Sequence, residues 1–257
     1  MKENEDKRFW HIRSANYDKL YWVTNQDYLD AIIKAGELKK NNIVLDVGTG
    51  TGTVAQEVKK YVSHVVAVDI SNSMLKAGKW DGISLIKWDI NNLLFANNVF
   101  DKVFARMVFH HILDELDRAL IRCYDMLKDK GKIIIAEGIP PSDDKDVVDW
   151  YTNMFKLKEK RRTFKSGDLH YYLEKNGFIN IKTEIHHMED FNINNWLINS
   201  GVQKSKQNEI IDMHTSASDK IKKTYNMRII NGECIVRTVN LIVSAQKYLN
   251  INTPKKL

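Results

Sequence analysis

One stretch decides the fold of this chain: Asn42-Ile43-Val44-Leu45-Asp46-Val47-Gly48-Thr49-Gly50-Thr51-Gly52-Thr53-Val54-Ala55. Its β-branched run ends in an acid and predicts a buried strand, and the residues after the glycines favour a helix. The alternating glycines let the turn take positive φ and let a ligand touch the main chain. Such a turn, at the carboxyl end of a strand, is where open α/β sheets bind nucleotides.

The spacing of the glycines separates two classes of cofactor. A dinucleotide fingerprint needs a glycine at position 53, where this chain has Thr53. The pattern from Asp46 through Gly48 and Gly50 to Gly52 instead resembles the first motif of class I S-adenosylmethionine-dependent methyltransferases. The resemblance implies a Rossmann-like, mostly parallel α/β sheet of seven strands in the order 3-2-1-4-5-7-6, with helices on both faces and a helical cap. A nicotinamide oxidoreductase is the alternative that Thr53 disfavours.

Further strands carry the rest of the resemblance. Val65 to Ile70 predicts a second buried strand, and Asp69 at its end lies near the spacing of about 20 residues expected for an acid that binds both ribose hydroxyls. The alternative is that Asp69 only caps the helix that begins at Ser71. Ile83 to Ile90 and Phe100 to Ile112 predict the third and fourth strands, and Phe100-Asp101 resembles the habitual opening of the fourth.

The type-11, quinone-biosynthesis-like group of small-molecule methyltransferases is the closest resemblance. It implies S-adenosyl-L-methionine as cofactor and S-adenosyl-L-homocysteine as product. Trp88 is left open between a flank of the adenine ring and a core residue. The cofactor-binding residues that we predict are Tyr17, Asp46, Gly48, Gly50, Gly52, Asp69, Ile70, Met74, Trp88, Asp89, Ile90 and Arg106.

The acceptor site follows from the residues after the fourth strand and from two insertions. A general base is required only if the acceptor must lose a proton, and His110 and His111 are the candidates. We expect no metal, because adjacent histidines without a helical partner are poor ligands. The substrate-binding residues that we predict are Met107, His110, Tyr151, Arg162 and Trp196. An arginine among them suits a carboxylate or phosphate.

The chain divides into a core and two interruptions. We predict an N-terminal helical lid over residues 1–40 and a methyltransferase core over residues 41–188 and 232–250. Helical insertions over residues 142–165 and 189–231 would form a cap on the acceptor site, since loops so long are usually functional.

Composition sets the remaining expectations. Two cysteines without a metal or disulfide pattern suit a reducing cytosol, and the charged N-terminus does not read as a signal peptide. We therefore expect a cytoplasmic enzyme without a membrane segment. The net charge of +6 is scattered, so we do not expect nucleic acid as a partner. An RNA-modifying methyltransferase and a non-catalytic S-adenosylmethionine-binding protein are the alternatives, and the oligomeric state is left open.

Overall fold

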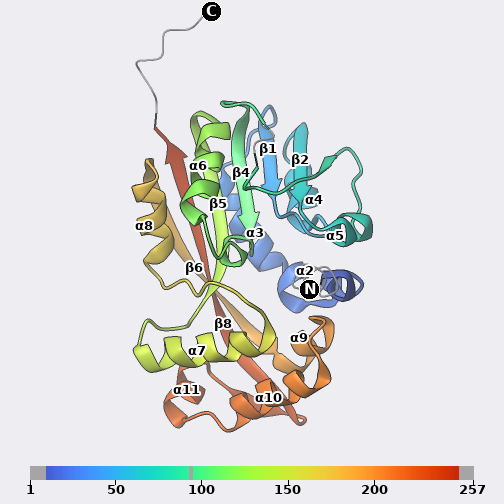
Figure 1. The fold of residues 1–257 in the computed structure, drawn as a ribbon, viewed down its shortest axis with the longest axis vertical. Coiled ribbons are helices and arrows are strands. Elements are labelled where there is room, and N and C mark those ends of the chain that lie inside the picture. The colour runs from blue at the N-terminus through green and yellow to red at the C-terminus, as the bar shows by residue number, and fades with distance from the viewer. Residues whose placement is uncertain (1–9, 93–94, 249–257) are drawn as a thin grey trace, which may run out of the picture.

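The computed structural model describes residues 10–92 and 95–248 and contains one mixed sheet (Figure 1). Its strands follow the order β3-β2-β1-β4-β5-β8-β6, and a short strand, β7, pairs with β8. The first five pair in parallel, and β8 is antiparallel to both β5 and β6. The predicted order is thereby confirmed, with β8 as the seventh strand of the prediction. The strands are β1 Ile43–Val47, β2 His64–Asp69, β3 Ser84–Lys87, β4 Phe100–Arg106, β5 Leu127–Ile139, β6 Phe178–Asn192, β7 Arg228–Ile230 and β8 Glu233–Lys247.

Helices cover both faces of the sheet because its buried strands are apolar on both sides. Along β5, Ile133 and Ile135 pack on one face with α6 and α8, whereas Ile134 and Ala136 face α3 and α4. Residues 10–14 are also helical. The helices are η1 Tyr17–Lys19, α2 Tyr21–Thr24, α3 Gln26–Gly36, α4 Thr53–Lys59, α5 Asn72–Ala77, η2 Phe109–His111, α6 Leu116–Met126, α7 Lys145–Lys158, α8 Asp168–Lys175, α9 Ile193–Asn199, α10 Lys204–Thr215 and α11 Asp219–Thr224.

A cap lies beyond the end of the core. Its helix α7 comes from the connection between β5 and α8, and α9, α10 and α11 come from the connection between β6 and β7 (Figure 1). The ring of Trp150 meets His214 edge-on at 4.9 Å, which joins α7 to α10. Lys220 forms ion pairs with Asp144 at 2.7 Å and Asp146 at 2.8 Å, which join α11 to the start of α7. The cap is therefore one packed unit, although its helices are separated along the chain.

Two long strands connect the cap to the core. Strands β6 and β8 have 15 residues each and run from the core at the top of Figure 1 to the cap at the bottom. Their pairing extends from Phe178–Lys247 to Asn192–Ile235. From the sequence we predict a sixth strand over Ile179 to Ile185, and the structure extends it to Asn192. The pairing of its distal half with β8 explains the extension, because each added residue satisfies backbone groups that a loop would leave to solvent.

The expected boundaries differ from the structure in three smaller respects. The histidines after β4 lie in a single turn of 3₁₀-helix, η2, and not in the following α-helix. Residues 189–192 belong to β6, so the helices of the second insertion span residues 193–224. Residues 1–9 of the expected lid and residues 249–250 of the expected core lie outside the described residues. Within residues 10–92 and 95–248, no helix has the length and apolar character that crossing a bilayer requires.

Candidate functional site

The glycine turn lies at the carboxyl ends of β1 and β2, as the sequence predicts. Gly48, Gly50 and Gly52 all have positive φ, between 59° and 89°. Side chains fill the space beside two of them. A Cβ added at Gly48 would lie 2.4 Å from a methyl of Val108, and one at Gly52 would lie 2.7 Å from the ring of Trp80. Glycine is therefore required at both positions by sterics as well as by conformation.

Two carboxylates hold the turn in shape. Asp69 accepts hydrogen bonds from the backbone N–H of Gly50 and of Ser71, both at 2.8 Å. Burial raises its pKa, and these N–H groups oppose the rise. Asp46 accepts a 2.6 Å hydrogen bond from the hydroxyl of Thr49, and burial raises the pKa of Asp46 to about 7.

The N-terminal segment closes against this turn. Asp18 accepts a 2.6 Å hydrogen bond from the hydroxyl of Thr51. A Cβ added at Gly50 would lie 3.4 Å from Cε1 of Tyr17, so the tyrosine ring covers the middle of the turn. This tyrosine also lines the cavity described below, and it therefore lies between the glycine turn and the cap.

The other predicted cofactor residues divide into two groups. Ile70 is 60% exposed beside Asp69, and Asp89 accepts the N–H of Asn91 at the end of the neighbouring segment. Met74, Trp88 and Ile90 are buried. The ring of Trp88 packs edge-on against Phe95, so the structure places it in the core, which is the second of the two interpretations left open above.

Arg106, which we predicted to bind the cofactor, contacts the N-terminal helices. Its guanidinium donates a 3.0 Å hydrogen bond to the backbone carbonyl of Val23 and lies 5.3 Å from the ring centroid of Trp22. It is buried and is not among the residues that line the cavity. In this structure Arg106 attaches the N-terminal helices to the end of β4, because a backbone carbonyl and an aromatic face satisfy its charge.

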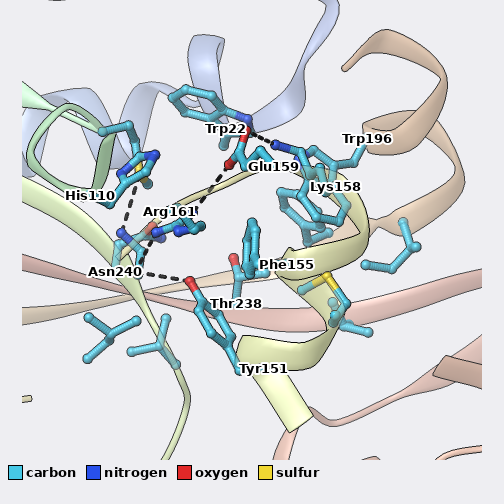
Figure 2. Close-up of a pocket in the computed structure, with 18 of the residues that line it drawn as sticks. Trp22, His110, Tyr151, Phe155, Lys158, Glu159, Arg161, Trp196, Thr238 and Asn240 are labelled. Carbon is cyan, nitrogen blue, oxygen red and sulfur yellow. Dashed lines mark hydrogen bonds and ion pairs between the residues drawn. The ribbon is translucent and has the colours of Figure 1, made fainter. Parts of the chain in front are cut away.

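A cavity of about 110 Å³ lies between the core and the cap (Figure 2). Its aromatic walls include Tyr151 and Phe155 from α7 and Trp196 from α9. The core contributes Met107, His110 and His111 from the segment after β4, and Gly138 and Asn240 from β5 and β8. Of the predicted substrate residues, the structure thus gathers Met107, His110, Tyr151 and Trp196 around one space.

Arg162 lies outside this cavity, so the prediction that it binds the substrate is corrected. Its guanidinium donates a 2.6 Å hydrogen bond to the carbonyl of Leu113 and lies over the ring of Tyr172. The preceding residue, Arg161, lines the cavity instead and lies 4.2 Å from the ring centroid of Phe155. Successive residues of an extended segment point to opposite sides, so only one of the pair faces the cavity.

A buried ionic cluster lines the same space, and the sequence analysis missed most of it. Glu159 pairs with Lys158 at 2.6 Å, with Arg13 at 3.2 Å and with Arg161 at 3.7 Å (Figure 2). Burial lowers the pKa of Lys158 to about 7, although Glu159 opposes the change. The adjacent cations hold the pKa of Glu159 well below its usual range, despite its burial. The two positive charges of Lys158 and Arg161 exceed the single negative charge of the carboxylate between them.

The second missed feature is a carboxylate beside a predicted histidine. Glu137 in β5 is fully buried, and its Oε2 lies 2.6 Å from Nδ1 of His110. Asn240, also buried in a strand, has an Nδ2 with no hydrogen-bond partner among the described residues. A signal for Glu137 existed in the sequence, because it is a lone acid after the apolar run Ile133 to Ala136.

One group of side chains has the spacing of a metal site. A nitrogen from each of His110 and His111 and an oxygen of Glu159 lie within 4.8 Å of one another. However, Oε2 of Glu159 already faces two cations, Lys158 and Arg13. Those positive charges oppose a bound cation, so we assign no metal to this group.

The sheet order, the glycine turn and the strand-end acids define a class I S-adenosylmethionine-dependent methyltransferase. Comparison with known proteins agrees: residues 45–135 match the family model described as "Methyltransferase domain", of type 11. Over residues 45–135 this chain therefore resembles that class of methyltransferases, and S-adenosyl-L-methionine is the cofactor of the class.

Among curated relatives, phosphoethanolamine N-methyltransferase 2 of Caenorhabditis elegans is 30% identical over 61% of this chain and 37% of its own length. The demethylmenaquinone methyltransferase of Thermotoga maritima is 36% identical over 38% of this chain and 44% of its own length. The chain therefore spans less than half the length of these two relatives.

Solved structures show the same fold over nearly the whole chain. The YcgJ protein of Bacillus subtilis superposes with a TM-score of 0.74 at 19% identity, over 86% of this chain and 97% of that one. Phosphoethanolamine N-methyltransferase 2 of Haemonchus contortus, solved with phosphomonomethylethanolamine and S-adenosylhomocysteine, gives a TM-score of 0.62 at 19% identity. The match covers 91% of this chain and 57% of that one.

Proposed function

We propose that this protein transfers the methyl group of S-adenosylmethionine to a small molecule that carries an anionic group. The observation that carries the proposal is the cavity under the cap, where Lys158 and Arg161 face one carboxylate. A buried surplus of positive charge is costly unless an anion compensates it. A carboxylate or phosphate on the acceptor would supply that anion, and Arg161 offers it a planar pair of donors.

The size and the walls of the cavity favour a small acceptor over a macromolecule. About 110 Å³ between aromatic side chains suits a compact metabolite, and a closed apolar wall keeps water away from the reacting atoms. The unpartnered Nδ2 of Asn240 would donate to an oxygen of the acceptor. The curated relatives are named for two small acceptors, phosphoethanolamine and demethylmenaquinone. Of these, phosphoethanolamine fits the cationic cluster better, because it carries a phosphate.

The cofactor would lie against the glycine turn. We propose that Asp69 binds its ribose hydroxyls, that Ile70 and Asp89 flank its adenine, and that Tyr17 covers the turn where its methionine portion lies. When bound, the cofactor supplies an electrophilic methyl group. The contribution of this chain is to hold the acceptor atom in line with that group and to exclude water, since an in-line displacement depends steeply on orientation. We propose oxygen or nitrogen as the methylated atom.

We also propose that residues 10–40 act as a lid and that the two insertions act as the acceptor cap. Tyr17 and Arg13 support this division, because both come from the N-terminal segment and line the cavity with residues of α7 and α9. A cytoplasmic location is part of the proposal, in agreement with two buried cysteines, Cys123 and Cys234, that form no disulfide.

Two measurements test the proposal. Calorimetry with S-adenosylhomocysteine measures the cofactor site, and release of S-adenosylhomocysteine measures turnover with a panel of small anionic amines and phenols, phosphoethanolamine among them. We expect turnover with at least one anionic acceptor and none with the counterpart that lacks the anionic group, for instance ethanolamine in place of phosphoethanolamine. Equal turnover of ethanolamine would remove the anion from the proposal. Cofactor binding without any turnover would favour the non-catalytic alternative.

A further inference from the structure

We propose that His110 is the general base of this methyl transfer and that Glu137 fixes its imidazole in the required tautomer. It follows that the acceptor atom is a hydroxyl oxygen or an ammonium nitrogen, which must lose a proton before or as it is methylated. The inference rests on the proposed function and narrows its acceptor to this chemical class.

The carboxylate of Glu137 is fixed in one orientation. Its Oε1 accepts the backbone N–H of Val108 at 3.0 Å and that of His110 at 3.3 Å. Its Oε2 is thereby directed at Nδ1 of His110, 2.6 Å away. When Glu137 is ionised, its oxygen can only accept in this contact, so Nδ1 then carries the proton and Nε2 has the free electron pair.

The free nitrogen lies on the edge of the ring away from β5. His110 lines the cavity, and Figure 2 shows it above the space bordered by Tyr151, Phe155 and Arg161. The imidazole follows directly after the end of β4, on the side of the sheet where the glycine turn also lies. An acceptor in the cavity would therefore be close to both Nε2 and the cofactor side of the sheet.

The electrostatic surroundings keep this imidazole neutral. Burial and then the guanidinium of Arg161 hold the pKa of His110 well below its usual range, and Glu159 opposes them. Burial raises the pKa of Glu137 to about 7, and the charge of Arg161 opposes this rise. The other charged or titratable groups that face the histidine are His111, Lys158 and Arg13.

The proposed step balances in atoms and charge. The oxygen or nitrogen of the acceptor forms a bond to the methyl carbon while the bond from that carbon to sulfur breaks, and its electron pair stays on sulfur. A hydroxyl acceptor gives its proton to Nε2 of His110 as the new bond forms, whereas an ammonium acceptor gives its proton to Nε2 first, because its nitrogen has no electron pair until that proton has left. The resulting imidazolium is stabilised by Glu137 through Nδ1–H, and the proton then passes to solvent.

The neighbouring His111 lacks this support. Its ring meets Trp10 edge-on at 5.1 Å and lies 4.0 Å from the ring of His110, but no carboxylate is hydrogen bonded to it among the described residues. The two adjacent histidines therefore make a matched pair: both line the cavity, and only His110 has an acid that fixes its tautomer.

The first test needs no acceptor. Long-range ¹H–¹⁵N spectra of the protein with S-adenosylhomocysteine should show His110 protonated at Nδ1. In Glu137→Gln the amide oxygen is held by the two backbone N–H groups, so its NH₂ group faces Nδ1 and the proton should move to Nε2. His111→Asn should leave the His110 tautomer as it is. A wild-type imidazole protonated at Nε2, or an unchanged tautomer in Glu137→Gln, overturns the inference.

The second test follows rates with phosphoethanolamine and 4-hydroxybenzoate, which combine an anion with a nucleophile that carries a proton. We expect His110→Asn and Glu137→Gln to lower kcat about 100-fold at pH 7, the typical contribution of a general base. Both should bind S-adenosylhomocysteine as tightly as wild type. Their rates should rise with pH toward the pKa of the acceptor, whereas the wild-type profile stays flat above neutrality.

Control variants separate a chemical role from a structural one. His111→Asn should keep the shape of the wild-type pH profile, and His64→Asn, at an exposed position in β2, should keep its rate as well. A Glu137→Gln variant with the wild-type kcat and profile contradicts the inference. Absence of wild-type turnover with both probes counts against the proposed function, and the tautomer then decides the role of the pair. If His110→Asn loses cofactor binding, Glu137→Gln supplies the rate comparison.

Discussion

The cofactor side of the sheet and the cap cavity are built in opposite ways. The first is mainly backbone: three glycines of positive φ, with the carboxylate of Asp69 holding the N–H of Gly50. The second is mainly side chains, and its charged groups come from three separate places, with Arg13 before the core, Lys158 in α7 and Arg161 in the loop that follows α7. A backbone site suits an invariant cofactor, whereas a site made of side chains can take a new acceptor by substitution.

This comparison predicts that a substitution on one side alters the binding of one ligand and leaves the binding of the other unchanged. The largest effect is expected for Gly50→Val. A β-branched residue resists φ of 59°, and its methyl groups would enter the space that Tyr17 covers. S-adenosylhomocysteine binding should fall below detection by calorimetry, while near-ultraviolet circular dichroism of the aromatic cap stays unchanged.

The control for that variant is Gly167→Val, at a position of negative φ where an added Cβ would meet nothing within 4 Å. It should bind S-adenosylhomocysteine normally. If Gly50→Val also binds normally, the glycine turn has only a structural role and the comparison fails.

The next effect in size is expected for Asp69→Ala. Loss of hydrogen bonds to a charged acceptor costs about 1.5–3 kcal/mol each, so cofactor affinity should fall roughly tenfold to a hundredfold. The KM of the acceptor should not change. Asp81→Ala, at an exposed acid, is the control. If Asp69→Ala and wild type bind the cofactor with equal affinity, Asp69 only caps the following helix and does not bind the cofactor.

On the other side, Arg161→Gln should raise the KM of the anionic acceptor by about tenfold, because one charged donor is lost. Cofactor affinity should be spared. Arg162→Gln is the matched control, because that guanidinium contacts Leu113 and Tyr172 outside the cavity. It should lower the free energy of unfolding by about 1 kcal/mol and leave KM as it is. Equal KM values for the two variants would contradict the anion site.

The smallest effect concerns pH. The pKa of Lys158 is lowered by burial to about 7, so its positive charge is present below that pH and is lost above it. The KM of an anionic acceptor should therefore rise about threefold between pH 6.5 and 8.5. Lys158→Arg should abolish this dependence, since a guanidinium stays protonated. The groups that face Lys158 are Glu159, Arg13 and Arg161, and the adjacent cations hold the pKa of Glu159 well below its usual range. If KM still depends on pH in Lys158→Arg, a group other than Lys158 is responsible for the dependence.

The sequence predicts the cofactor side well because its determinants are local. The strand, the turn and the helix from Ile43 to Lys59 are contiguous, and Asp69 follows at a fixed spacing. The same holds for sheet order, which the succession of apolar strands and helices constrains.

The cap could not be predicted in the same way. The choice between Arg161 and Arg162 depends on the direction of one extended segment, which no periodicity in the sequence specifies. Arg106 was assigned to the cofactor because strand ends face the ligand, but packing of α2 against β4 gives it the carbonyl of Val23. Glu137 lies in an apolar strand, and its role depends on His110, which is 27 residues away in the sequence.

The long pairing of β6 with β8 has a consequence for exchange of ligands. The ladder between β6 and β8 restrains the cap, because each inter-strand hydrogen bond resists bending, although its register shifts between Ile179 and Lys182 and between Met188 and Phe191. Acceptor entry and product exit must then depend on the parts that no ladder fixes: the segment from Trp10 to Lys19 and the loop from Glu159 to Phe164. These two are joined by the ion pair of Arg13 with Glu159, buried at 3.2 Å. The lifetime of that single contact would set how quickly the enzyme can turn over.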